Sequence, residues 1–397
     1  MLRQTTTVLS LSAALLSLAT PTDAQACYEN DHQCFSFAPA YEDIDVYDTG
    51  VPLEGERYKI RGDIRLRARM ANAPNDAPYN EADQQATRAR VSVEFKVNEH
   101  AHVFAEYNFS ETWAGSVKYS DADPANPVNE LAQAYLHVDD LFGWDDTWRV
   151  GRSNYNLGNG LVLGSCDFLQ YPSTFTGVWA SKQCDQLAFE AFAFDNYGQL
   201  NLMPGTRFAG LTTKYDVNED LVLKAYYMTG TGDGDLPSDD AWLGVDAGGN
   251  APAELDWVAE YAHRKVDGGD DLEAYRGRIG RNFDGLLERV SFTRTGSQGA
   301  MHVNPADFNS AGLVHQYGGA WRSDINTNQL GFDLAPCEEL DLNFNLLTFS
   351  GSDAMLGDTE LDVLVGKHLA QGIYGSIGYG RDNEDRQVGY VQLTAYF

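Results

Sequence analysis

Arginine is the residue type whose spacing in this chain could do chemistry. Between Tyr58 and Met70 every odd position is charged, and every even position is apolar or glycine. A row of guanidinium groups on one strand face would attract anions, because a guanidinium fits a carboxylate through two parallel hydrogen bonds. The same alternation places further arginines on that face, and the candidates are Arg61, Arg65, Arg67, Arg69, Arg88, Arg90, Arg276 and Arg278.

A structural role for these arginines is the alternative. Asp63, Glu94, Glu106 and Glu260 follow the same alternation, so the guanidinium groups could pair with them inside the molecule. Both roles can hold together, because a charged channel wall needs partial neutralisation. The sequence leaves this choice open.

Other chemistry has little support in the sequence. The chain has no G-x-S-x-G nucleophile motif and no C-x-x-C or H-x-x-x-H spacing for a metal. Gly158-Asn159-Gly160 lacks the Lys-Ser/Thr pair of a phosphate-binding loop, and Asp233-Gly234-Asp235 lacks the remaining ligands of a calcium loop. We therefore expect no catalytic residue, no cofactor and no bound metal, and predict that the protein is not an enzyme.

Composition narrows the class of protein. The 397 residues contain 28 Lys plus Arg and 58 Asp plus Glu, a net charge of −30. This balance disfavours nucleic-acid binding, which depends on cations placed at phosphates. A mean hydropathy of −0.38 and the lack of a long apolar run beyond the N-terminus exclude a helical membrane protein. A membrane β-barrel remains, because its strands face lipid with every second residue only.

The elements that must position the arginines are strands. Runs with a period of two recur along the chain, and the first is too long for an ordinary strand but suits a tilted membrane strand. We predict an all-β fold, a transmembrane antiparallel β-barrel of eighteen strands, with sixteen as the alternative count. The predicted strands are 58–70, 88–97, 102–109, 131–138, 147–152, 175–181, 186–194, 207–215, 221–228, 255–264, 272–281, 286–294, 312–322, 329–335, 340–349, 360–369, 372–381 and 387–397.

The connections and the C-terminus favour the outer membrane of a Gram-negative-type bacterium. Short periplasmic turns are expected at 98–101 and 336–339, and a long outer loop at the Gly/Asp-rich stretch 230–254. The alternation of turns and loops fails at 282–311, where a short connection stands in a loop position. The chain ends on an aromatic residue, Phe397, which is typical of bacterial barrels and is expected to engage the barrel-assembly machinery.

The N-terminal region is predicted to be a leader. Residues 1–26 combine Arg3, an apolar stretch and the small-x-small site Ala24-Gln25-Ala26, as in a secretory signal peptide. Residues 27–57 are expected to be a periplasmic segment without strong structure, and residues 58–397 the barrel. Cysteines suit an oxidising compartment, and Cys337 is expected to be an unpaired buried thiol. The sequence does not decide how the five cysteines pair, namely Cys27, Cys34, Cys166, Cys184 and Cys337.

One stretch carries a family resemblance. Trp148-Arg149-Val150-Gly151-Arg152 is followed by a Gly-rich segment at 158–164 and by Phe175-Thr176-Gly177-Val178. This order resembles the alginate-export family of outer-membrane porins, and the Glu-Leu-Asp triplets at 339–341 and 360–362 are similar to that family's closing region. The resemblance implies an arginine-rich constriction that passes acidic polysaccharide outward, and adds Arg152 and Arg149 to the candidates.

Two departures from that family bear on the solute. The chain is shorter than the alginate exporter itself, and shorter loops favour small solutes. It is also far more negative, which argues against a polyuronate substrate. We predict a porin that passes anionic saccharide or polysaccharide through an arginine-lined lumen, with outer-membrane lipid as its surroundings. The alternatives are a general small-solute porin, an outer-membrane barrel enzyme such as a lipid hydrolase, and a secreted soluble β protein that binds polysaccharide.

Overall fold

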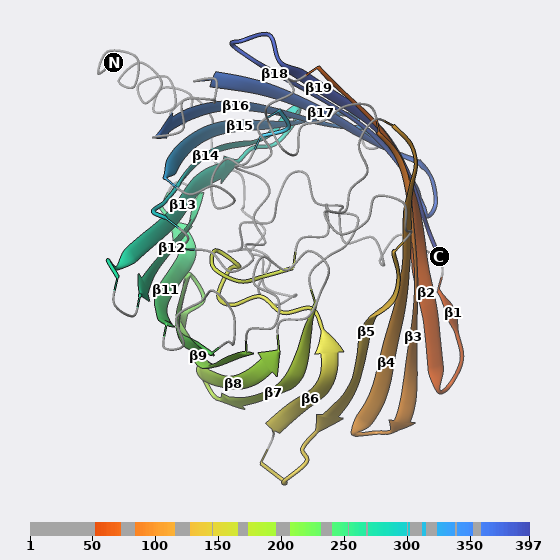
Figure 1. The fold of residues 1–397 in the computed structure, drawn as a ribbon, viewed down its shortest axis with the longest axis vertical. Coiled ribbons are helices and arrows are strands. Elements are labelled where there is room, and N and C mark those ends of the chain that lie inside the picture. The colour runs from red at the N-terminus through yellow and green to blue at the C-terminus, as the bar shows by residue number, and fades with distance from the viewer. Residues whose placement is uncertain are drawn as a thin grey trace.

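The chain forms one closed antiparallel barrel in the computed structural model (Figure 1). Strands β2 to β19 are each hydrogen-bonded to their neighbours along the chain, and β19 pairs with β2 to close the ring. A two-residue strand, β1, pairs with the start of β2. The structure describes residues 52–72, 84–115, 128–144, 146–165, 174–195, 207–231, 240–252, 254–266, 269–299, 301, 312–314, 324–337, 340–351 and 359–397.

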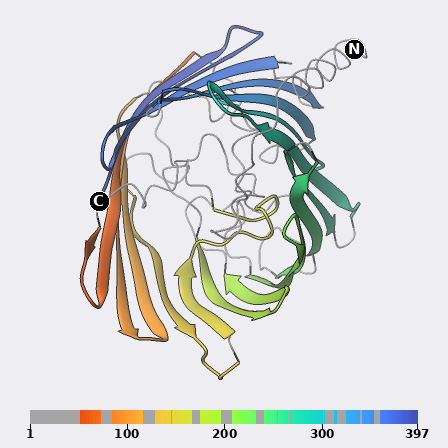
Figure 2. The same ribbon diagram turned by 180° about the vertical axis from the view of Figure 1, so that it is seen from behind.

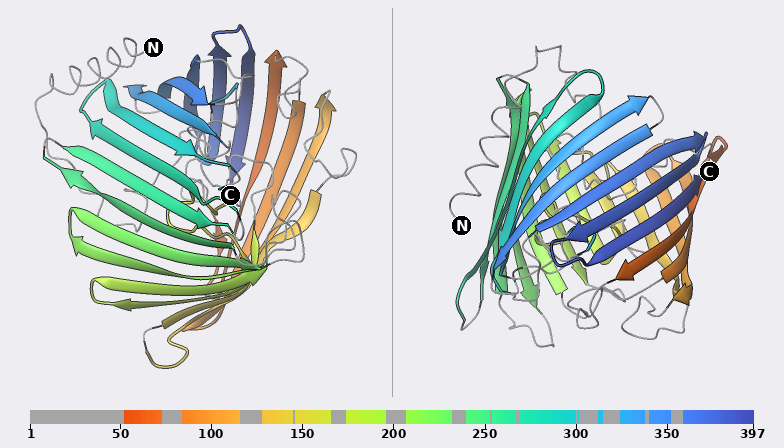
Figure 3. Two further views of the ribbon diagram at one scale, coloured as in Figure 1. Left: turned by 60° about the vertical axis from the view of Figure 1, so that its left-hand side comes forward. Right: turned by 90° about the horizontal axis from the view of Figure 1, so that it is seen from above.

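The predicted all-β barrel of eighteen strands is confirmed. The strands cross the wall obliquely (Figure 3). Their bounds are β1 Leu53–Glu54, β2 Tyr58–Asn72, β3 Gln84–Asn98, β4 Ala101–Gly115, β5 Val128–Asp139, β6 Asp146–Ser153, β7 Phe175–Cys184, β8 Leu187–Asp195, β9 Arg207–Asn218, β10 Leu221–Thr231, β11 Asp240–Ala251, β12 Leu255–Lys265, β13 Leu272–Asn282, β14 Leu287–Ser297, β15 Ile325–Cys337, β16 Leu340–Gly351, β17 Thr359–Ala370, β18 Ile373–Asp382 and β19 Gln387–Tyr396.

The period of two divides the wall into an outer and an inner face. In β2, Ile64, Leu66 and Met70 are exposed, whereas Asp63 and Arg65 between them are fully buried. Exposed leucine, valine, isoleucine and aromatic side chains recur on the same face of the other strands. Successive side chains of a strand point to opposite faces, so this face meets lipid and the charged face encloses the interior.

Two strand predictions are wrong. The predicted number of strands is still correct, because one strand was missed and another was predicted where the sheet has none. The stretch 230–254, predicted as a loop, contains β11, which pairs with β10 and β12 along its length. Its glycines and aspartates look like a loop, yet Leu243 and Val245 are exposed outward while Trp242 and Asp246 are buried. The predicted strand 312–322 is absent from the sheet, because β14 pairs directly with β15; of its residues the structure describes only 312–314, which lie in a turn.

These corrections restore the order of connections that failed in the sequence. With β11 in place, residues 283–286 form a short turn between β13 and β14, and residues 298–324 form a long connection between β14 and β15. Apart from the four-residue connection 383–386 between β18 and β19, which lies at the opposite end, the short turns 99–100, 185–186, 219–220, 283–286 and 371–372 lie at one end of the barrel, together with the start of β2 and the end of β19. We call this the turn end and the opposite end the loop end. In outer-membrane barrels the turn end is periplasmic.

Some predictions fall at the edge of the described chain or outside it. The signal peptide, most of the periplasmic segment, Cys27, Cys34 and Cys166 lie outside the described residues. Cys184 and Cys337 are both unpaired and exposed, so the expectation of a buried Cys337 is wrong. In the part of the chain that the structure describes, no helix is long and apolar enough to span a membrane.

Candidate functional site

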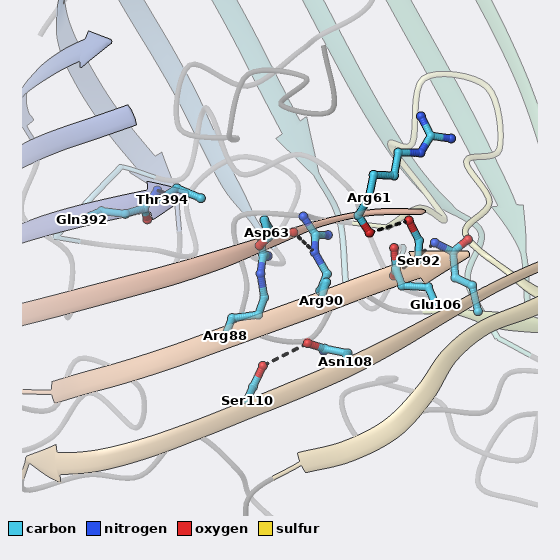
Figure 4. A network of polar contacts seen from close by, with 11 residues as sticks. Arg61, Asp63, Arg88, Arg90, Ser92, Glu106, Asn108, Ser110, Gln392 and Thr394 are labelled. Atoms are coloured by element: carbon cyan, nitrogen blue, oxygen red, sulfur yellow. Dashed lines mark hydrogen bonds and ion pairs between the residues drawn. The ribbon is translucent and has the colours of Figure 1, made fainter. Parts of the chain in front are cut away.

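Six of the candidate arginines lie on the inner face of β2 and β3, and Figure 4 shows three of them, Arg61, Arg88 and Arg90. Arg61, Arg65, Arg67 and Arg69 follow one another on β2 at every second or fourth residue, and Arg88 and Arg90 lie on β3. The register places Arg65 directly opposite Arg88. We call these six residues the arginine ladder. The two strands contain only two acidic residues, Asp63 and Glu94, so cations outnumber carboxylates on this part of the wall.

Asp63 forms ion pairs with two arginines of the ladder, Arg88 and Arg90. Its Oδ2 lies 2.5 Å from Arg90 Nε and its Oδ1 3.3 Å from Arg88 Nη2, and all three side chains are almost completely buried. One carboxylate neutralises only one of two guanidinium charges, so these three side chains together carry a net positive charge. Part of the arginine set therefore does pair within the wall, as the structural alternative expects.

Of the remaining ladder residues, Arg61 and Arg67 are more open, whereas Arg65 and Arg69 are buried. Arg61 Nη2 lies 3.5 Å from Glu94 and keeps about a quarter of its side chain exposed, at 26%. Arg67 donates from Nε to Gln392 Oε1 at 2.7 Å and lies over the ring of Tyr390. Arg67 thus contacts neutral groups, whereas Arg61 is paired with an acid.

Arg149 is held by an aromatic ring rather than by an acid. Its guanidinium carbon lies 4.7 Å from the centroid of Tyr135, and Tyr135 stacks on Phe104 with centroids 5.0 Å apart. Gly151 is the register neighbour of Tyr135, and a Cβ there would lie 2.8 Å from Tyr135 Cα. Within the described chain Arg149 has no ion-pair or hydrogen-bond partner, so its donors are available to a solute.

Arg152 is placed differently from the other candidates. It shares a strand face with Val150, which is 51% exposed on the outer surface, and its register neighbour on β7 is Thr176. Arg152 donates to Thr176 Oγ1 at 3.2 Å and to the Leu131 carbonyl at 3.3 Å. It lies one residue from the loop end of β6 and is left out of the functional proposal below.

Arg276 and Arg278 lie on β13, across the ring from the ladder (Figure 1). Arg276 Nη2 is 3.1 Å from Glu260 and donates to the Asn159 carbonyl at 2.7 Å. Arg278 lies 3.6 Å from Asp256. Asp256 also lies 2.5 Å from Arg289 Nη2. Both candidate arginines are therefore held by acids of the wall, which gives them a structural role.

A chain segment that sequence reasoning missed occupies the interior. Residues 154–165, between β6 and β7, run inside the ring of strands (yellow in Figures 1 and 2). Leu157, Leu161, Val162 and Leu163 are fully buried. They pack in one apolar cluster with Phe175, Trp179, Phe192, Phe194, Phe208, Tyr226, Met228 and Trp242 from the wall. The Leu-Val-Leu run between glycines was the available signal, because an exposed outer loop would not need it.

Polar contacts fix this internal segment to the wall at Tyr155 and Asn159. Asn159 accepts from Lys224 Nζ through its side chain at 3.1 Å and from Arg276 through its carbonyl. Tyr155 donates to Glu190 Oε1 at 2.7 Å. Burial, with the nearby Glu190 carboxylate, raises the pKa of Tyr155 well above its usual value, so the hydroxyl stays protonated and keeps donating.

A second internal contact comes from residues 312–314. The backbone N–H of Leu313 donates to Asp362 Oδ2 at 3.1 Å and that of Val314 to Glu360 Oε1 at 2.6 Å. Both side chains and both carboxylates are buried. The predicted strand at 312–322 therefore starts as a segment that folds against the inner wall, and apolar residues there face the interior rather than lipid.

Together these features divide the interior. The segment 154–165 and its apolar cluster cover the side from β7 to β13, residues 312–314 contact β17, and the ladder lies on β2 and β3. Among the described residues no group of three or more His, Cys, Asp or Glu side chains could hold a metal ion. The arrangement can attract and guide an anion through charge and hydrogen bonds.

Comparisons with known proteins agree with this geometry. The family described as alginate export matches residues 57–280. No curated protein matches the chain. Among solved structures, the outer membrane protein opdK from Pseudomonas aeruginosa has a TM-score of 0.64 at 14% identity and covers 86% of this chain and 99% of its own. Acinetobacter baumannii OccAB3 has a TM-score of 0.64 at 13% identity and covers 86% of this chain and 99% of its own. P. aeruginosa OccK2 (OpdF), solved in complex with glucuronate, has a TM-score of 0.63 at 13% identity and covers 86% of this chain and 96% of its own. At these identities the likeness shows the fold.

Proposed function

The chain belongs to the alginate export family, and from this membership we propose that it passes anionic saccharides along the arginine ladder. That the protein is an outer-membrane porin follows from the family and the closed lipid-facing barrel. The finer proposal concerns the solute. It is a passive channel, without catalysis, in which the charge and width of the interior decide what passes.

The excess of arginine over acid on β2 and β3 carries the proposal. Six guanidinium groups share a wall with Asp63 and Glu94, and Arg149 adds a seventh without an acidic partner. Arg61 and Arg67 keep part of their side chains exposed, so a carboxylate can contact these two, while the buried Arg65, Arg69, Arg88 and Arg90 contribute positive charge behind them. Uronic acids suit such a path, since each carries one carboxylate beside hydroxyl groups.

Two comparisons support a uronic acid as the solute class. The family is described by alginate export, and alginate is a polymer of uronic acids. The structural neighbour OccK2 was solved with glucuronate. The internal segment 154–165 narrows the interior here, which favours single chains or short oligomers over bulky polymers.

Ion selectivity in planar bilayers tests the proposal. The reversal potential in a KCl gradient should indicate preference for chloride, and short uronate oligomers should block the current more than neutral oligomers of equal length. Arg61→Gln with Arg67→Gln should lower both effects. Arg207→Gln is the matched control, because Arg207 lies at the loop end of β9 with most of its side chain exposed and is paired with Asp195. A preference for potassium would remove the proposal and favour general small-solute diffusion.

A further inference from the structure

A polar patch interrupts the lipid-facing surface at the loop end of β12 to β15. Tyr275 shares a strand face with Ile279, which is exposed on the outer surface. Arg294 lies on the same outer face, because its neighbours Thr293 and Thr295 are buried inward. The register joins these residues to other outward polar side chains. We call the set the rim patch: Tyr261, Glu273, Tyr275, Arg294, Asn326 and Asn328.

The rim patch lies at a border between polar and apolar surface. Counted from Arg294 and Asn328, the outward positions two residues closer to the turn end are apolar, and this row extends over five neighbouring strands. They form a continuous register row of Trp257, Ile279, Phe292, Leu330 and Leu346. Such a border is expected where the hydrocarbon of the membrane ends and the lipid headgroups begin. Because this is the loop end, these headgroups belong to the outer leaflet.

Arg294 is fixed in one orientation within the patch. Its Nε donates to the Tyr275 hydroxyl at 3.4 Å, and its guanidinium carbon lies 6.0 Å from the Tyr275 ring centroid. Tyr275 in turn donates to Asn326 Oδ1 at 2.8 Å. Gly296 makes room for this contact, since a Cβ there would lie 2.7 Å from the Tyr275 ring and 2.4 Å from Asn326 Oδ1. The side chain therefore extends toward the loop end, over the next register row.

The charge of Arg294 has no acidic partner in the described chain. Its terminal nitrogens donate to no described protein group, and the nearby Glu273 accepts instead from the Tyr261 hydroxyl. Across the strand pair lies Asn328, whose Nδ2 donates to Thr348 Oγ1 at 3.2 Å. An oriented guanidinium at a headgroup border, beside amide and hydroxyl groups, is complementary to a phosphate attached to a sugar.

We propose that the rim patch binds the phosphorylated sugar headgroup of an outer-leaflet glycolipid. The terminal nitrogens of Arg294 donate to phosphate oxygens, and Asn328 and Tyr275 contact the hydroxyl or amide groups of the sugar. The bound lipid stabilises an arginine that would otherwise face the membrane without a counter-charge. This site lies on the outer wall, and it does not depend on which solute passes through the interior.

Lipid binding to the purified full-length protein in detergent tests the proposal. The probe is lipid A with both phosphates, compared with the same lipid after removal of its phosphates, by native mass spectrometry. Wild-type protein should prefer the phosphorylated form by about tenfold or more, as for a hydrogen bond to a charged group. Arg294→Gln should remove this preference, Arg294→Lys should keep part of it, and Tyr275→Phe should weaken it.

Arg207→Gln is the matched control, because Arg207 is also an outward arginine at the loop end but is paired with Asp195 at 3.1 Å. It should bind lipid A as wild type does. Two results would overturn the proposal: equal binding of phosphorylated and dephosphorylated lipid A, or equal loss of binding in Arg207→Gln and Arg294→Gln. Competition by phosphatidylglycerol as strong as by lipid A would also overturn it, since the surface would then recognise any anionic lipid. Heat-shift electrophoresis verifies that each variant is a folded barrel.

Discussion

Among single residues, Asp63 is expected to contribute most to the packing of β2 against β3. Its carboxylate contacts two buried guanidinium groups, those of Arg88 and Arg90. Asp63→Asn should remove the carboxylate that both guanidinium groups share and lower the free energy of unfolding by about 3–5 kcal/mol. Urea unfolding followed by tryptophan fluorescence measures this. Ser92→Ala, which removes only a hydroxyl donor to the Arg61 carbonyl, should cost about 1 kcal/mol, and an equal loss in both variants would contradict the role given to Asp63.

Arg149 should show the opposite behaviour. Because it contacts only the Tyr135 ring within the described chain, Arg149→Gln should change stability by about 1 kcal/mol or less. Its unpaired charge lies inside the barrel, so the variant should shift the reversal potential away from chloride preference. Unchanged selectivity with a large loss of stability would instead make Arg149 a structural residue.

The sequence predicted which strand face carries most of the arginines, but it did not predict for every arginine whether the side chain points into or out of the barrel. Period-two spacing was enough to place Arg65, Arg88 and Arg276 on one face, since each lies within a long regular strand. Arg152 was predicted inward and lies on the outer face of its short strand. Its position depends on register, and the neighbouring strand β5 has a register shift where it pairs with Glu106 and Tyr107 of β4, which no local pattern reveals. Pairing of Asp63 with two arginines also needed the register of two strands.

Among the elements, the internal segment 154–165 is expected to limit the width of the pore. Gly158 has a φ of +60°, and a Cβ there would lie 2.8 to 3.0 Å from Tyr226, Glu260 and Asp246. Gly158→Ala should therefore push the segment away from the wall and change the single-channel conductance. Gly285→Ala is the matched control, because Gly285 also has a positive φ, of +98°, but open space around it. Equal conductance in both variants would show that the segment does not limit the current.

The alternation of apolar and polar residues predicted the regular strands. It failed where glycines hide a strand or where apolar residues belong to a segment inside the barrel. Strand β2 was predicted almost to its ends, because thirteen residues alternate without a break. Strand β11 was missed, since Gly244, Gly248 and Gly249 lower its strand propensity, although Gly244 fits an inner face crowded by Tyr226. The reverse error at 312–322 arose because apolar residues that pack inside the barrel resemble residues that face lipid. Spacing within a segment does not show on which side of the wall the segment lies.

For the whole molecule, closure of the ring depends on the seam between β19 and β2. Gly62 of β2 exchanges backbone hydrogen bonds with Phe397, the last residue, and a Cβ at Gly62 would lie 2.2 Å from the Arg90 carbonyl oxygen and 2.8 Å from the Phe397 ring. Gly62→Ala should therefore force the two ends of the chain apart and cost about 1–3 kcal/mol, the usual penalty of overpacking.

The temperature at which the barrel loses its heat-shifted mobility in electrophoresis measures this effect. Gly389→Ala provides the control on the same seam: Gly389 pairs with Met70, and a Cβ there would meet its nearest neighbour at an ordinary 3.8 Å. The Gly62 variant should open at a clearly lower temperature than the Gly389 variant. If both variants open at the wild-type temperature, closure of the barrel does not depend on the close contact between Gly62 and Phe397. The backbone pairing of β19 with β2 would then be sufficient to hold the ring closed.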